Sequence, residues 1–123
     1  MLQGLYKIIS FSDIGESSYI AEVEVNQGDS VFAGHFPGHP VLPGVCSVNI
    51  LKDCVCRSEG KKLRFSEISQ CKFTGMVDPA VNCNLKVKFS TACLNTGHLV
   101  KAIMENDDRV VLKMTAIMVE DLR

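Results

Sequence analysis

One segment, residues 34–45, constrains this chain more than any other: it reads Gly-His-Phe-Pro-Gly-His-Pro-Val-Leu-Pro-Gly-Val. Its prolines fix the backbone φ angle at about −65°, and its glycines allow conformations that other residues resist, so the loop carrying His35 is stiff. Pro43 suits the first turn of a helix, because the N–H that proline lacks would be unpaired there. The free amides that follow could point at an oxygen near His35. This pattern predicts a base beside a group that polarises an electrophile.

An apolar helix is predicted to start at Pro43 and to end at about Arg57. Apolar residues recur there at intervals of three and four, which is typical of one face of a helix. These residues are Val45, Val48, Leu51, Cys54 and Val55, and Cys46 and Ile50 widen the apolar arc. Because a helix this apolar must be covered, we expect a sheet to wrap around it.

Strand-like segments lie on both sides of this helix. Residues 18–25 alternate between apolar and polar side chains, as in a strand with one face toward solvent. Turn-forming residues at 95–97 and 106–108 favour an antiparallel meander near the end of the chain. Four further strands are predicted at 63–73, 82–94, 99–105 and 109–120. One helix followed by several long strands is the order expected when an antiparallel sheet curls around that helix.

Residues 35–45 resemble the motif of the 3-hydroxyacyl-acyl carrier protein dehydratases of the hot-dog fold, in which His-Phe-Pro-Gly-x-Pro-Val-x-Pro-Gly-Val leads into the central helix. Outside this motif the similarity is one of pattern, over residues 5 to 120. The resemblance implies an α+β hot-dog fold, with an antiparallel sheet around a long central helix, and we expect one such domain over residues 1–123. It also implies a lyase, a dehydratase of fatty acid or related lipid biosynthesis.

The same resemblance implies roles for individual residues. His35 takes the place of the family's catalytic histidine, and a backbone amide at Gly44 or Val45 would hold the thioester carbonyl. Phe36 would also contact the substrate, as would Phe73, which ends a segment that looks like the strand lining the family's acyl tunnel. An imidazole with an ordinary pKa of about 6.5 suits proton transfer at neutral pH.

Asn49 departs from the family pattern, because the second catalytic group of the family is a carboxylate at this position. The amide of Asn49 exchanges no proton near neutral pH, but it could orient a hydroxyl or a water molecule. Positioned proton transfer typically contributes ~10²–10⁴-fold, so its loss predicts a slow enzyme. Three alternatives stay open: His35 serves as both base and acid, Asp53 one helical turn later supplies a carboxylate, or Asn49 makes only a structural hydrogen bond.

The spacing of the cysteines predicts neither a disulfide framework nor a zinc site. The chain has six of them, at positions 46, 54, 56, 71, 83 and 93. We expect reduced, structural thiols, with Cys71, Cys83 and Cys93 in apolar strand surroundings. Cys46 lies three residues before Asn49, which leaves a thiol nucleophile as a weaker alternative. The proposed chemistry requires no metal or redox cofactor, and His98, after a hairpin turn, is expected to be exposed.

The net charge of −1 argues against a dedicated nucleic-acid-binding protein. No apolar run approaches the roughly 20 residues that span a bilayer, and residues 1–7 lack the features of a signal peptide, so we expect a cytoplasmic protein without a membrane anchor. A basic stretch is formed by Lys52, Arg57, Lys61, Lys62 and Arg64. It is either a solvated helix end or a docking surface for an acidic acyl carrier protein.

Three functional hypotheses follow from these observations. The first is a homodimer that dehydrates a 3-hydroxyacyl thioester, or hydrates the product, on acyl carrier protein or coenzyme A. The family's assembly implies that His35 of one subunit would face Asn49 of its partner. The second hypothesis is an acyl thioesterase in which Asn49 orients the attacking water. The third is a non-catalytic subunit that pairs with an active homologue retaining the carboxylate.

Overall fold

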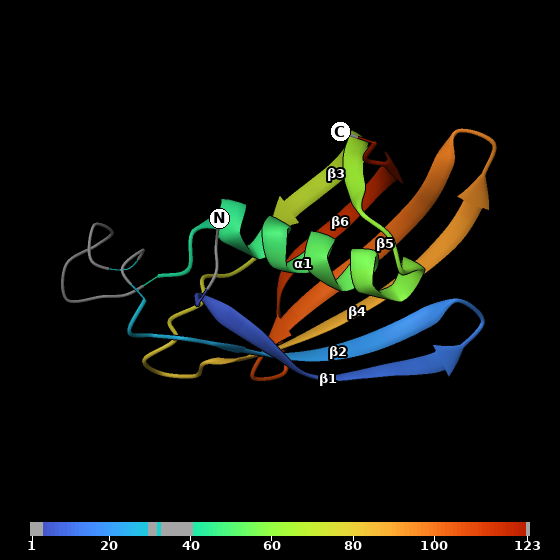
Figure 1. Ribbon diagram of the computed structural model, residues 1–123. Coiled ribbons are helices and arrows are strands. Elements are labelled where there is room, and N and C mark those ends of the chain that lie inside the picture. The colour runs from blue at the N-terminus through green and yellow to red at the C-terminus, as the bar shows by residue number, and fades with distance from the viewer. Residues whose placement is uncertain (1–3, 30–31, 33–40, 123) are drawn as a thin grey trace.

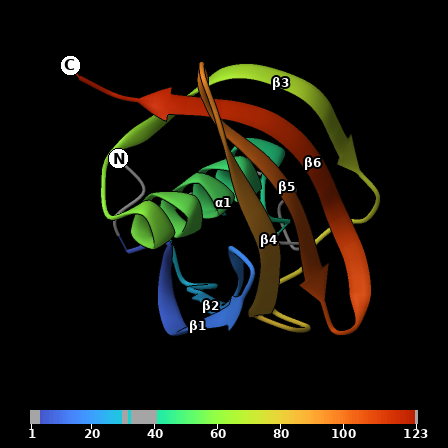
Figure 2. The same ribbon diagram turned by 90° about the vertical axis from the view of Figure 1, so that its right-hand side faces the viewer.

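The computed structural model describes residues 4–29, 32 and 41–122. Its elements are, in chain order, β1 (Tyr6–Gly15), β2 (Ser18–Val25), α1 (Gly44–Glu59), β3 (Leu63–Phe73), β4 (Asn84–Leu94), β5 (Gly97–Asn106) and β6 (Arg109–Glu120). The six strands of these described residues form one antiparallel sheet in the order β1-β2-β4-β5-β6-β3. The sheet curves around α1 (Figures 1 and 2). The predicted hot-dog fold is confirmed.

The observed element boundaries lie close to the predicted ones, with one omission. The strands predicted at 18–25, 63–73 and 109–120 are confirmed as β2, β3 and β6, and α1 extends two residues beyond the predicted end. The sequence pattern did not predict β1, whose register against β2 shifts between Ile8 and Ser10. Such a bulge interrupts the alternation of apolar and polar residues by which a strand is recognised.

Backbone conformation explains both ends of α1. Pro43 precedes the helix in an extended conformation, with φ −61° and ψ 145°. The last helical residue, Glu59, is followed by Gly60, whose φ of 68° is left-handed and whose N–H donates to the carbonyl oxygen of Cys56 at 2.9 Å. Glycine adopts this conformation without the steric cost that a side chain would add.

The hydrophobic core lies between α1 and the concave face of the sheet. The helix contributes Ile50, Leu51, Cys54 and Val55, and the sheet contributes Val23, Val87, Val100, Met104, Leu112 and Met118, all fully or almost fully buried. Val45, which the pattern placed on the apolar face, is instead 67% exposed. It lies in the first turn of α1, beside Gly44.

Among the strands, β3 is unusual because almost all of its side chains are exposed. Its first residue, Leu63, is buried, whereas Ile68 and Phe73 are 45% and 51% exposed. β3 is an edge strand and pairs only with β6 within the described part of the chain. Its other edge therefore presents backbone N–H and C=O groups that are available for another strand.

Candidate active site at the start of the helix

The first turn of α1 contains backbone N–H groups that precede the first hydrogen bonds of the helix. The first bonds of the helix run from the N–H groups of Cys46 and Ser47 to the carbonyl oxygen of Pro43, at 3.0 and 3.2 Å. The amides of Gly44 and Val45 precede these bonds, in the position where a helix carries unsatisfied donors and a partial positive charge. An oxygen with developing negative charge is the chemical group that fits there.

Gly44 also allows a close approach of Phe73. A Cβ atom added at Gly44 would lie 2.9 Å from Cζ of the Phe73 ring, so the ring packs directly over the glycine backbone. β3 thus brings one predicted substrate-contacting residue against another on α1. His35 and Phe36, which are predicted as a catalytic and a substrate-contacting residue, lie outside the described residues.

An apolar pocket of about 380 Å³ adjoins this contact. Its lining residues are Val41, Leu42, Pro43, Gly44, Ser47, Phe73, Gly75, Met76, Val77 and Val111. Gly44 and Phe73 therefore line the same pocket, and their contact with a substrate stays a prediction. Val45 does not line it, because its side chain points toward solvent. An acyl chain is the kind of ligand that such a lining accommodates.

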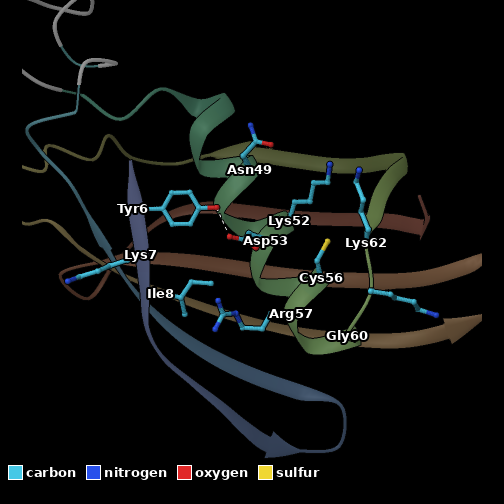
Figure 3. Close-up of a pocket in the computed structure, with 11 residues that line it drawn as sticks. Tyr6, Lys7, Ile8, Asn49, Lys52, Asp53, Cys56, Arg57, Gly60 and Lys62 are labelled. Carbon is cyan, nitrogen blue, oxygen red and sulfur yellow. Dashed lines mark hydrogen bonds between the residues drawn. The ribbon is translucent and has the colours of Figure 1, made fainter. Parts of the chain in front are cut away.

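Asn49 lies on a different side of α1, in a groove of about 900 Å³ between β1 and the helix (Figure 3). We call this the β1–α1 groove; its lining residues are Tyr6, Lys7, Ile8, Asn49, Lys52, Asp53, Cys56, Arg57, Gly60, Lys61 and Lys62. The Nδ2 group of Asn49 donates to the carbonyl oxygen of Val45 at 3.1 Å. The amide thus makes a hydrogen bond within its own helix, which links the groove to the first turn of α1.

Asp53 lines the same groove as Asn49, as the spacing of four residues predicts. The hydroxyl of Tyr6 donates a hydrogen bond of 2.7 Å to Oδ2 of Asp53 (Figure 3). Burial, and then the hydrogen bond and negative charge of Asp53, raise the pKa of Tyr6 far above its ordinary value. Tyr6 therefore stays a neutral donor. Sequence reasoning missed it, since it lies on the strand that was not predicted.

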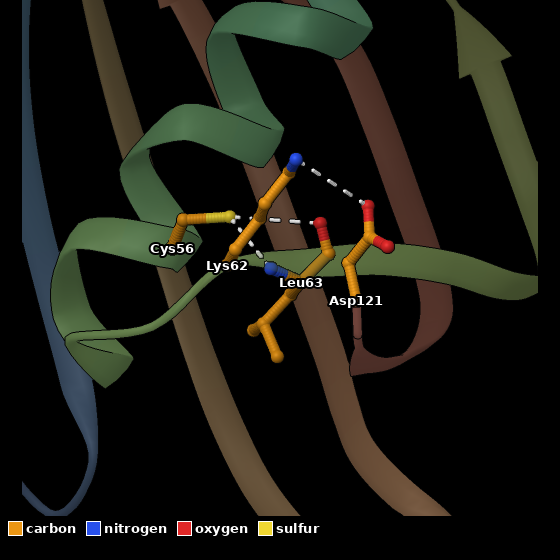
Figure 4. A network of polar contacts seen from close by, with 4 residues as sticks. All are labelled: Cys56, Lys62, Leu63 and Asp121. Carbon is orange, nitrogen blue, oxygen red and sulfur yellow. Dashed lines mark hydrogen bonds and ion pairs between the residues drawn. The ribbon is translucent and has the colours of Figure 1, made fainter. Parts of the chain in front are cut away.

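Four of the five residues of the basic stretch line the groove, and Arg64 does not. Lys62 forms an ion pair with Asp121 at 4.0 Å (Figure 4), and Lys7 forms one with Glu24 at 3.7 Å. The same region holds Cys56, whose Sγ accepts a hydrogen bond from the N–H of Leu63 at 3.3 Å. This bond attaches the end of α1 to the start of β3.

The cysteines do not favour nucleophilic chemistry. All six are free thiols, as predicted. Cys46 is buried, and burial followed by the charge of Asp29 raises its pKa. A thiol is less nucleophilic when its thiolate is disfavoured, so the alternative of a Cys46 nucleophile loses support. The expectation of apolar surroundings is wrong for Cys71 and Cys93, which are exposed.

His98 is another difference from expectation, because its side chain is only 14% exposed. Its Nδ1 lies 3.6 Å from a carboxylate oxygen of Glu59, at the end of α1. Thr91 donates to the other oxygen of Glu59 at 3.2 Å. The β4–β5 hairpin folds over the end of the helix and removes His98 from solvent.

The described ranges contain no group of three or more His, Cys, Asp or Glu side chains that could hold a metal ion. None of the helices in this part of the chain has the length and apolar character needed to cross a membrane.

Comparison with protein families gives a match over most of the chain. The model described as "ApeI-like: ApeI dehydratase" matches residues 12–112. A curated relative, the 3-hydroxyacyl-acyl-carrier-protein dehydratase FabZ of Chlamydia trachomatis serovar L2, is 33% identical over 100 residues, which are 74% of this chain and 65% of that protein. FabZ of Ligilactobacillus salivarius is 33% identical over 97 residues, or 73% and 69% of the two chains. FabZ of Novosphingobium aromaticivorans is 32% identical over 75 residues, which are 54% of this chain and 48% of that protein. The chain thus spans about half the length of this relative and about two thirds of the other two.

Solved structures show the same fold. A chain of the dehydratase heterocomplex ApeI:P from Xenorhabdus doucetiae superposes with a TM-score of 0.78 and 18% identity, covering 93% of this chain and 97% of that one. The PaaI protein of E. coli, from the phenylacetic acid degradation operon, superposes with a TM-score of 0.66 and 13% identity, covering 98% and 83%.

Proposed function

Because this chain belongs to the ApeI-like dehydratase family, we propose that it binds a 3-hydroxyacyl thioester and removes water from it, or adds water in the reverse direction. The carrier of the acyl group would be an acyl carrier protein, as the names of the FabZ relatives state for those proteins. The observation that carries this proposal is the apolar pocket that Gly44 and Phe73 line beside the first amides of α1. Its lining suits an acyl chain, and the amides suit an enolate-like oxygen.

The proposed reaction uses one imidazole and the helix start. His35 takes the proton from C2 of the acyl group, while the amide of Gly44 or Val45 stabilises the oxygen of the thioester. His35 then returns the proton to the C3 hydroxyl, which leaves as water. Across the proposed dimer, Asn49 of the other subunit accepts a hydrogen bond from that hydroxyl through Oδ1, because its Nδ2 already donates to its own helix. Phe36 contacts the acyl group.

The proposed assembly is a dimer in which β3 pairs with a strand of a second subunit. The exposed edge of β3 supports this proposal, because a long unpaired edge strand is a template for further pairing. The partner is either a second copy of this chain or a homologue. Asn49 favours a homologue that retains the carboxylate, since that pairing would restore an acid to the site. The solved ApeI:P complex is itself a dehydratase heterocomplex.

Product analysis on the purified chain tests the proposed function. A 3-hydroxyacyl-acyl carrier protein is incubated with the wild-type chain and with His35→Ala, and the carrier is weighed by mass spectrometry. The proposal expects loss of one water from the carrier with the wild-type chain and none with His35→Ala. An identical rate in both chains would overturn it, and release of free acid from a saturated acyl thioester would favour the thioesterase alternative.

Location in the cytoplasm and a single domain over residues 1–123 stay predictions.

A further inference from the structure

The turn between β5 and β6 holds two polar side chains beside each other. Asp107 and Asp108 occupy the turn with left-handed φ angles of 54° and 62°, as the two central residues of a type I′ hairpin do. Asn106 and Arg109 therefore lie opposite each other as register partners, at the end of β5 and the start of β6. Nη2 of Arg109 donates to Oδ1 of Asn106 at 3.3 Å. This hydrogen bond restrains the guanidinium.

Asn106 is itself held firmly, because it is buried and uses both ends of its amide. Its exposed fraction is only 3%. Its Nδ2 group donates to the carbonyl oxygens of Asn82 and Asn84, at 3.1 and 2.9 Å. These two bonds use both hydrogens of the amide, and Oδ1 remains to accept from Arg109. The start of β4 thus determines the orientation of the side chain that restrains Arg109.

Arg109 connects this turn to the wall of the apolar pocket. Its Nη2 also donates to the carbonyl oxygen of Met76, at 2.9 Å. A Cβ atom added at Gly75 would lie 2.8 Å from Nη1 of Arg109, so the guanidinium packs against the glycine backbone. Gly75 and Met76 line the apolar pocket, whereas Arg109 does not. The guanidinium therefore lies behind the wall and supports it from outside the pocket.

Other hydrogen bonds hold the two ends of this wall. Thr74 donates from Oγ1 to the carbonyl oxygen of Val110 at 2.7 Å. The N–H of Leu42 donates to the carbonyl oxygen of Val77 at 2.9 Å. Between these two attachments the contact comes from a side chain, that of Arg109. The position of the middle of the wall thus depends on Arg109.

We propose that Arg109 is a positioning residue that sets the depth of the apolar pocket, and through it the length of the acyl chain that the protein accepts. The inference rests on the proposed function, in which this pocket receives the acyl chain. Removal of the guanidinium leaves space behind Gly75 and takes the donor from the carbonyl oxygen of Met76. A longer chain can then push the wall outward, and each further buried methylene strengthens binding by roughly fourfold.

Equilibrium binding of saturated acyl chains tests the assignment. The probes are saturated acyl groups on one acyl carrier protein, in a series that lengthens by two carbons at each step. They carry no hydroxyl that could leave as water, so binding is measured without turnover. In the wild-type chain, affinity is expected to rise with chain length up to a limit at which the pocket is filled. In Arg109→Ala the rise should continue one step further, with a gain of about tenfold at that step.

Two further variants serve as controls. Arg109→Lys keeps a donor and an aliphatic stem behind Gly75, so it is expected to keep the wild-type limit. Thr91→Ala removes a hydrogen bond of 3.2 Å to Glu59 at the other end of α1, and it is also expected to keep that limit. A loss of stability alone would lower the affinity of every chain by the same factor and would leave the limit where it is.

Three results would overturn the assignment. They are an unchanged limit in Arg109→Ala, the same shift of the limit in Thr91→Ala, and no gain of affinity with chain length in the wild-type chain. If the wild-type chain never dehydrates a 3-hydroxyacyl-acyl carrier protein but Arg109→Ala still moves the limit, the proposed function fails while this inference stands. If dehydration depends on His35 but the limit does not move, the inference alone fails.

Hydrogen exchange measures the position of the wall without any ligand. In Arg109→Ala the backbone amides of residues 75–77 are expected to exchange faster than in the wild-type chain, because the wall opens more readily once its support is removed. Thr91→Ala should leave their exchange unchanged. Equal exchange of these amides in Arg109→Ala and in the wild-type chain would contradict the positioning role.

Discussion

Asn49 donates a hydrogen bond of 3.1 Å from Nδ2 to the carbonyl oxygen of Val45, one turn earlier in α1. An ionised carboxylate at this position could not make the bond, because it has no proton to donate. The amide is thereby oriented by its own helix and keeps Oδ1 as an acceptor. In the proposed function, this oxygen is the group that orients the substrate hydroxyl.

The contact between Gly44 and Phe73 predicts a stability effect. Gly44→Ala places a methyl group 2.9 Å from the Phe73 ring, which must then move. We expect a loss of about 1 kcal/mol in the free energy of unfolding, at the low end for overpacking because the ring is half exposed. Urea denaturation measures this loss. In a Phe73→Ala background Gly44→Ala should cost less, and equal costs in both backgrounds would show that the ring does not limit Gly44.

The buried thiol of Cys54 predicts weaker folding at alkaline pH. Burial, the larger cause, raises the pKa of Cys54 from 9.0 to about 12, so the native state keeps a proton that the unfolded chain releases. The contribution of this thiol to stability is therefore complete below pH 9 and is lost as the pH rises toward about 12.

Cys54→Ala provides the comparison for this prediction. Between about pH 8 and about pH 10.5 the wild-type chain should lose ~1–2 kcal/mol more of its free energy of unfolding than the variant does. The measurement is chemical denaturation at both pH values. Parallel losses in the two chains would mean that Cys54 ionises as readily in the native state as in the unfolded one.

The exposed edge of β3 predicts an effect on assembly. Ile68 is 45% exposed on this strand, and a lysine there should oppose edge-to-edge pairing. We expect Ile68→Lys to shift the chain from dimer to monomer in sedimentation experiments. Ile103→Lys is the control, because Ile103 has a similar exposure of 36% on β5, inside the sheet. If both variants sediment like the wild-type chain, β3 is not the interface.

The fold could be predicted from the sequence largely because its signals are local. The helix start at Pro43 and the alternation in β2 depend on neighbouring residues, and both are confirmed. β1 was missed because a bulge breaks its pattern, and Tyr6 was missed with it. The exposure of Cys71 depends on the position of β3 at the sheet edge, and no local pattern carries that information.

The candidate site was predictable to a similar extent. The spacing of four placed Asp53 beside Asn49 correctly, because helical geometry alone determines it. The burial of His98 was not predictable, because it depends on how the β4–β5 hairpin packs over the end of α1. The contact of Phe73 with Gly44 joins two distant segments, and no local pattern predicted it; the family resemblance had implied only that both residues contact the substrate.

The role of the position that Asn49 occupies is tested most directly by the rate of enoyl formation in Asn49→Glu. This variant and Asn49→Gln, which has the same length without a titratable group, are compared with the wild-type chain on a 3-hydroxyacyl-acyl carrier protein. If this position is that of the missing acid, Asn49→Glu should be faster by ~10²–10⁴-fold, Asn49→Gln should not, and His35→Ala should abolish the gain. An Asn49→Glu chain no faster than Asn49→Gln, or a gain that survives His35→Ala, would contradict the account.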